Sequence, residues 1–194
     1  MNGEKQGKTS KMKMVRSAKE CAFIAVFVAV LIASQLVLSA IPGVEVVTAL
    51  FAVYAFSFGY KKSLAVATTF SLLRQLIFGF FPTVLILYLT YYNLFALAFA
   101  FLGKKIKNPI KGLVIVVASA CVFTALFTLL DCVITPLFYG FSQKATRAYF
   151  YASTPVMIPQ IICAGISTAL LFLPLWRAFL LINRLAGTSG VGQK

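Results

Sequence analysis

The segment TTFSLLRQLIFGFF, residues 68–81, places a permanently charged arginine inside an apolar run. A guanidinium that faces lipid costs roughly 3 kcal/mol or more, so Arg74 is predicted to face a protein interior and to have a partner there. The chain has four acidic residues, of which two belong to the basic N-terminal region. The other two, Glu45 and Asp131, are therefore the candidates to share a site with Arg74 inside the membrane.

The composition is typical of a polytopic membrane protein. The 194 residues are 61% hydrophobic with a mean hydropathy of +0.94, which is too apolar for a soluble domain and too long for a single anchor. The formal net charge is +14, but the basic residues form short clusters between apolar segments. Such clusters indicate membrane topology rather than nucleic-acid binding. We therefore predict an all-α, multi-pass protein of the cell (plasma) membrane.

Several kinds of chemistry are excluded by what the sequence lacks. It contains no histidine, so Ser-His and Cys-His nucleophile systems and the HExxH zinc motif are absent. The four cysteines show no metal-ligand spacing, and there is no GxxxxGK[ST] loop for ATP. We predict no enzymatic activity, no metal site and no cofactor, so the energy for any transport has to come from a partner or an ion gradient.

Apolar segments long enough to be helices recur along the chain. A cleaved signal peptide is the alternative for the first of them, but its apolar run is long for that and is taken as an uncut span. The predicted organisation is a basic tail (1–19), a six-helix transmembrane domain (20–184) and a C-terminal tail (185–194). The six predicted spans are 21–40, 45–60, 64–81, 82–102, 112–136 and 155–176, with a long aromatic connection at 137–153.

The basic residues then orient the bundle. With six spans both termini share one side, which carries fifteen Lys and Arg residues against two, Lys144 and Arg147, on the other. The positive-inside rule places both termini in the cytoplasm.

Strongly polar side chains are biased toward the outer half of the predicted spans. Such groups belong in wet pockets or paired interiors, so the pattern predicts a cavity open to the outside. The alternative is structural: an Arg74–Asp131 ion pair, amides that bond between helices, and tyrosines that only pack or anchor. The candidate binding residues are Glu45, Arg74, Asn93, Asp131 and Gln160, with Gln35 at a similar depth and Tyr91, beside Tyr88 and Tyr92, to stack on a ring.

The first span carries a second pattern. Alanines recur every three or four residues, giving small-xxx-small pairs that let another helix approach closely. Packing within the same chain is the alternative explanation for this stripe. Its members are Ala18, Ala22, Ala25, Ala29 and Ala33.

Taken together, the chain resembles the substrate-binding S component of energy-coupling factor (ECF) transporters. The resemblance runs from about Lys13 to Arg184. It is carried by the size, the six spans, the basic cytoplasmic N-terminus, the alanine stripe, and the run EVVTALFAVYAFSFGYKK (45–62) followed by a span with Arg74.

This resemblance implies a division of labour. The first-helix alanines, here Ala25, Ala29 and Ala33 or the pair Ala18 and Ala22, would dock on a transmembrane coupling subunit. Two cytosolic ATPases would supply the energy, and a vitamin or related micronutrient would bind in an outward cavity gated by the segments around Pro42 and 139–151. A stand-alone secondary transporter, with Asp131 or Glu45 as the coupling carboxylate, is the alternative, although no inverted repeat is evident.

Overall fold

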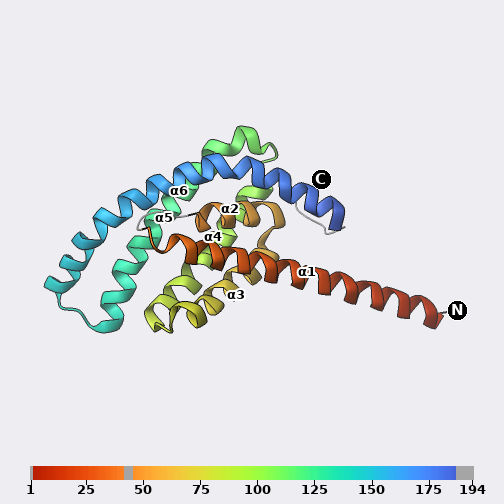
Figure 1. The fold of residues 1–194 in the computed structure, drawn as a ribbon, viewed down its shortest axis with the longest axis horizontal. Coiled ribbons are helices and arrows are strands. Elements are labelled where there is room, and N and C mark those ends of the chain that lie inside the picture. The colour runs from red at the N-terminus through yellow and green to blue at the C-terminus, as the bar shows by residue number, and fades with distance from the viewer. Residues whose placement is uncertain (1, 42–45, 187–194) are drawn as a thin grey trace.

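The computed structural model describes residues 2–41 and 46–186, with side chains described for 18–41 and 46–182. The described residues form helices and no strand, which confirms the predicted all-α class (Figure 1). The helices are α1 (Asn2–Leu38), α2 (Val47–Phe58), α3 (Tyr60–Phe78), α4 (Pro82–Lys105), α5 (Pro109–Tyr139) and α6 (Gln143–Ala186).

Four helices are long and apolar enough to cross a membrane. They are the Ala18–Leu38 part of α1, α4, α5, and α6 as far as Ile182. The other two predicted spans differ from this pattern. With 12 residues, α2 is about 18 Å long and shorter than a hydrocarbon core of about 30 Å. The 19-residue α3 is less apolar because it carries Lys61, Lys62 and Arg74.

The short helix α2 forms the centre of the molecule. Every residue from Val47 to Phe58 is buried except Leu50, which is half-buried. A helix that is apolar on all sides is stable only when other elements enclose it, and α2 contacts each of the other five helices (Figure 1). It lies close to α4, where a Cβ added at Gly103 would lie 2.2 Å from the Phe56 carbonyl oxygen.

The predicted connection at 137–153 is wrong, because most of it is helical. Helix α5 continues to Tyr139 and α6 begins at Gln143, well before Pro155, where the last span was predicted to start. Gly140 ends α5 in a left-handed conformation (φ 63°, ψ 41°), which glycine adopts without strain. Ser142 then begins α6, because its hydroxyl accepts a hydrogen bond from the Ala145 N–H at 3.3 Å.

This tight turn makes α5 and α6 a long hairpin. The hairpin tip projects beyond the ends of α1, α3 and α4 (Figure 1). Three prolines, Pro155, Pro159 and Pro174, lie inside α6. The last span was predicted to start at Pro155, yet membrane helices tolerate proline within their length.

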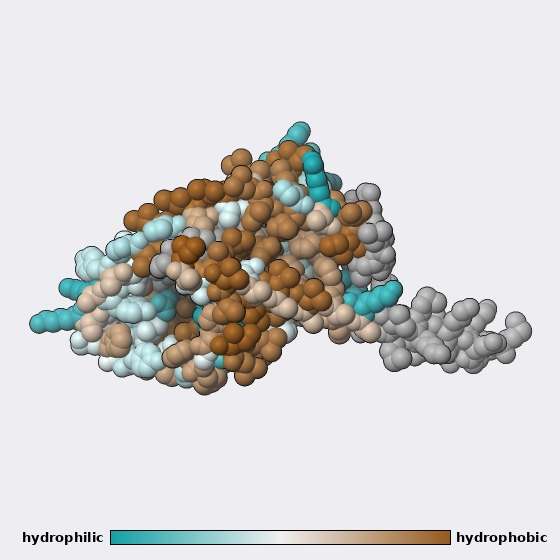
Figure 2. All heavy atoms as spheres, in the orientation of Figure 1, coloured by the Kyte–Doolittle hydropathy of each residue, from teal (hydrophilic) through white to brown (hydrophobic). Residues whose placement is uncertain are grey.

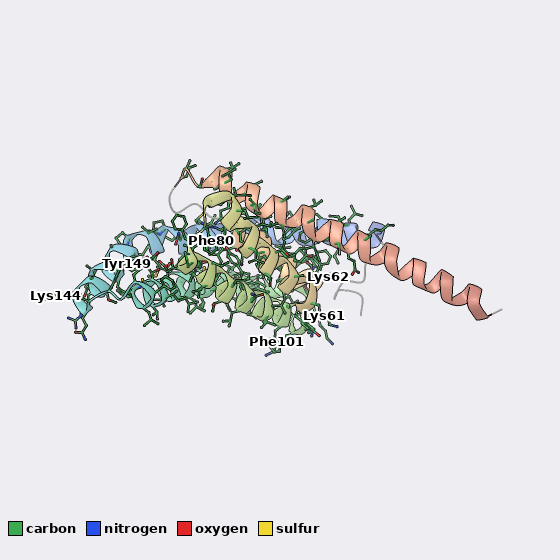
Figure 3. The ribbon with its side chains drawn as sticks, turned by 90° about the horizontal axis from the view of Figure 1, so that it is seen from below. Lys61, Lys62, Phe80, Phe101, Lys144 and Tyr149 are labelled. Carbon is green, nitrogen blue, oxygen red and sulfur yellow. The ribbon has the colours of Figure 1, made fainter. Side chains whose placement is uncertain are left out.

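Charged residues lie at the two ends of the molecule. Lys61 and Lys62 lie at one end and Lys144 at the hairpin tip (Figure 3). At the first end, which we call the basic end, Lys62 pairs with Glu20 of α1 at 3.2 Å. Figure 2 shows hydrophilic groups at both ends and a broad hydrophobic surface between them. Such a belt is expected of a helical protein that lies across a bilayer.

Candidate functional site

Polar side chains from three helices meet in the half of the bundle away from the basic end. The Gln35 amide of α1 donates a hydrogen bond to the Tyr88 hydroxyl of α4 at 2.7 Å. The Arg74 guanidinium of α3 lies over the Tyr88 ring, 4.3 Å from its centroid, and 4.8 Å from the centroid of Phe78. We call these residues, together with Gln75, which follows Arg74 on α3, the Arg74 cluster.

The cluster contains polar atoms that no described residue satisfies. Arg74 Nε, Gln35 Oε1 and Gln75 Nε2 are buried and have no hydrogen-bond partner in the described part of the chain. Leaving one such group unpaired costs about 1–3 kcal/mol. Arg74 Nε and Gln75 Nε2 are unpaired donors and Gln35 Oε1 is an unpaired acceptor, so each could bond a polar group of a ligand.

Gln75 is a member of this cluster that the sequence analysis missed. Its side chain is only 4% exposed, and its Oε1 accepts a hydrogen bond from the Phe81 N–H at 3.3 Å. That bond ties the end of α3 to the start of α4. Gln75 is a second polar residue beside Arg74 in an apolar segment, and this position could have identified it as a candidate.

The rings beside the cluster form a continuous aromatic layer between α4 and α5. The Tyr88 ring is 5.7 Å from that of Phe127, and the Tyr91 ring is 4.9 Å from Phe127 and 5.0 Å from Tyr92. Tyr91 is 2% exposed. The structure therefore places Tyr91 inside the helix interface, while Tyr88 is the tyrosine that contacts the cation.

Asp131 belongs to a separate site in the hairpin. Its carboxylate accepts hydrogen bonds from the Thr135 hydroxyl at 2.8 Å and from the Tyr149 hydroxyl at 2.6 Å. No ion pair joins it to Arg74 among the described side chains, and α3 and α5 are not in contact. The sequence analysis missed Thr135 and Tyr149, although Thr135 stands four residues from Asp131, the spacing at which helical side chains meet.

Helix lengths explain the separation of Arg74 and Asp131. The two residues are at similar distances from the outer ends of their predicted spans, but those ends are not level, because α5 projects past the end of α3 (Figure 1). Counted from the basic end at 1.5 Å per residue, Arg74 is about 18 Å from Lys62. Asp131 is about 30 Å from Lys111 on the same count.

The remaining candidates lie elsewhere. The Asn93 amide donates to the Leu89 carbonyl at 2.7 Å and accepts from the exposed Thr68 hydroxyl at 3.4 Å, so it joins α4 to α3 rather than entering the Arg74 cluster. Gln160 is half-buried on α6. Glu45 lies outside the described residues.

The alanine stripe of α1 points away from the bundle. Ala25, Ala29 and Ala33 are exposed, as are Ala18 and Ala22. The opposite side of α1 is the packed one: Phe27 and Leu31, for example, are 6% and 0% exposed. The stripe is therefore available to a second protein.

Comparison with known proteins found no matching family model, curated protein or solved structure. Function has therefore to be argued from the site. Among the described residues, no group of three or more Cys, Asp or Glu side chains is placed to hold a metal ion. The chemistry that the Arg74 cluster offers is binding, through one cation, unpaired amide atoms and an aromatic surface.

Proposed function

We propose that this chain is the substrate-binding S component of an ECF-type importer in the cell membrane. It would capture a small polar nutrient, such as a vitamin, and deliver it through a coupling subunit driven by two ATPases. The observation that carries the proposal is the exposed alanine stripe on an apolar helix whose other side packs on the bundle through residues such as Phe27 and Leu31. In lipid, close helix approach at small residues is a main source of association, so an unused stripe suits a partner helix.

The proposed topology is a six-helix bundle with both termini in the cytoplasm. Helix α2 is too short to match the hydrocarbon thickness, but its neighbours enclose it, so it need not contact lipid along its length. The basic end, which carries the α2–α3 and α4–α5 corners, would face the cytoplasm. The Arg74 cluster would then lie in the outer half of the membrane, within reach of a ligand from outside.

Arg74 is the proposed anchor for the substrate. A carboxylate or phosphate of the nutrient would pair with the guanidinium. The five N–H donors of a guanidinium match the geometry of such groups. The unpaired amide atoms of Gln35 and Gln75 would add hydrogen bonds, and the Tyr88 ring would support the bound molecule from one side. Asp131 would not take part in this substrate site, because it is bonded to Thr135 and Tyr149 within the α5–α6 hairpin.

The test is copurification from the native membrane with a variant of the alanine stripe. Ala29→Trp places a bulky ring on the stripe, whereas Val30→Trp places the same ring on an exposed position at the same depth, about 100° around the helix. The unmodified chain and Val30→Trp should retain coupling and ATPase subunits together with a bound small molecule in native mass spectrometry. Ala29→Trp should lose the subunits and keep the small molecule.

Two results would count against the proposal. Loss of subunits and ligand together in Ala29→Trp would mean that the stripe serves folding or binding rather than docking. If the unmodified chain retains no subunits and transports by itself in liposomes, with uptake that collapses when an ionophore is added, the secondary transporter is correct instead.

A further inference from the structure

A surface cleft of about 470 Å³ lies between α5 and α6 near the hairpin tip. Such a volume is within the range of about 300–1,000 Å³ that is typical of sites for small molecules and cofactors. Its walls are mostly apolar and it contains one charged residue, Arg147. The lining residues are Leu129, Cys132, Val133, Thr146, Arg147, Phe150 and Tyr151.

This cleft faces away from the Arg74 cluster. Phe127 marks the bundle side of α5, because its ring contacts Tyr88 and Tyr91. Leu129 is two residues further along the helix and so points about 200° away from Phe127. Leu129 and Val133 are 42% and 62% exposed, so this side of α5 is open beside α6.

The depth of the cleft places it at a membrane boundary. Lys111 lies at the start of α5, at the basic end, and the hydrocarbon core is about 30 Å thick. At 1.5 Å per residue, Leu129 and Val133 are about 27 and 33 Å from Lys111. The apolar walls therefore reach the far edge of the hydrocarbon, and Arg147, nearer the hairpin tip, lies at the level of the lipid headgroups.

The cation of the cleft, Arg147, has no ion-pair partner among the described side chains. Glu20 and Asp131 are the acids whose side chains the structure describes, and neither forms an ion pair with Arg147. Glu20 is at the basic end, and Asp131 is engaged by Thr135 and Tyr149. The exposed Lys144, one turn away from Arg147, does not line the cleft.

We propose that the cleft binds an anionic phospholipid, with an acyl chain between α5 and α6 and the phosphate at Arg147. An apolar wall that ends in a cation at headgroup depth complements both halves of such a lipid. Basic residues that face lipid headgroups favour anionic over zwitterionic lipids. The bound lipid would fill the cleft and fix the projecting hairpin relative to the membrane surface. This inference requires only that the hairpin crosses the membrane and does not depend on the proposed transport function.

The sole tryptophan of the chain, Trp176, makes a direct test possible. A Trp176→Phe, Tyr151→Trp background carries one tryptophan at the cleft, because Tyr151 lines it and is 74% exposed. The full chain is reconstituted in vesicles of acyl-brominated phosphatidylglycerol or phosphatidylcholine, and quenching gives the relative affinity of the two lipids. Arg147→Gln is compared with Lys144→Gln, which removes the same charge from a residue that does not line the cleft.

We expect phosphatidylglycerol to be preferred by about fivefold in the parent background, since one cation near the headgroups contributes about that factor. Arg147→Gln should reduce the preference to about one, whereas Lys144→Gln should leave most of it. Equal quenching by both lipids in the parent would overturn the proposal. An equal loss in the two variants would also overturn it, because a diffuse surface potential would then explain the preference.

Discussion

Replacing Arg74 with methionine should separate substrate binding from folding. Methionine keeps an unbranched side chain of similar reach but removes the charge and all five donors. If Arg74 anchors a substrate, the variant should fold and lose affinity. If Arg74 serves the structure alone, the variant should lose stability and any bound ligand should be unaffected.

The contacts of Arg74 set the expected size of both effects. The variant loses two ring contacts, each worth about 0.5–2 kcal/mol, over Tyr88 and Phe78. It also removes the buried, unpaired Nε, whose burial costs about 1–3 kcal/mol. These terms oppose each other, so the free energy of unfolding should fall by no more than about 3 kcal/mol. Losing a charged hydrogen bond of about 1.5–3 kcal/mol should weaken an anionic ligand by about 10- to 150-fold.

The assay combines three measurements on the purified chain in mild detergent. Native mass spectrometry identifies the copurified small molecule, isothermal calorimetry gives its Kd, and chemical unfolding gives the stability. Arg177→Met is the matched control, since Arg177 is exposed on α6 toward the basic end, and the substitution is the same. It should leave both quantities unchanged.

One combination of results would refute the argument for Arg74. This would be an unfolding free energy lower by more than about 4 kcal/mol in Arg74→Met with an unchanged Kd, since the ring contacts and the unpaired Nε cannot account for it. Arg74 would then be a structural residue, and the substrate site would have to be sought elsewhere.

Three further substitutions test the packing around the site. Gly103→Ala should lower the unfolding free energy by more than about 2 kcal/mol, because the added methyl group meets the Phe56 carbonyl oxygen and two backbones must separate; chemical unfolding checks it, and an unchanged midpoint would contradict the close approach. Tyr149→Phe removes the 2.6 Å hydrogen bond to Asp131 and should lower the unfolding free energy by about 1–2 kcal/mol. Asp131→Asn keeps an acceptor and should lower it by less. Chemical unfolding would show the reverse order if the carboxylate were bonded elsewhere. Gly140→Ala should cost about 1 kcal/mol through strain at φ 63°, with nothing within 4 Å for the methyl to touch; proteolysis at the hairpin turn should rise, and unaltered cleavage would argue against the left-handed turn.

Much of the helical architecture could be predicted from the sequence because membrane helices are encoded locally. Apolar runs of about 20 residues and basic clusters between them define helices and their ends without knowledge of neighbours. The predicted starts of α4 and α5 and the end of α1 agree with the structure to within about three residues. The hairpin was missed because its outer turns mix aromatic and polar residues, a composition that hydropathy does not recognise as helix.

The members of the site were harder to predict. A buried charge such as Arg74 is visible in any apolar run, but its partners depend on how the helices pack. The sequence suggested Asp131, whereas the structure supplies the rings of Tyr88 and Phe78. Asn93 and Gln35 are both amide residues within apolar segments, so the sequence does not distinguish them. In the structure only Gln35 reaches the Arg74 cluster.

The sequence alone determined that this is a helical membrane chain with one strongly basic end and an arginine within an apolar segment, because hydropathy and charge act residue by residue along the chain. Only the tertiary structure decided which side of α1 is exposed, how far the α5–α6 hairpin projects, and that Arg74 and Asp131 occupy separate sites. Those properties depend on the rotation and axial offset of helices relative to one another. Rotation and offset are fixed by contacts between residues far apart in sequence, such as Gln35 with Tyr88 or Phe127 with Tyr91.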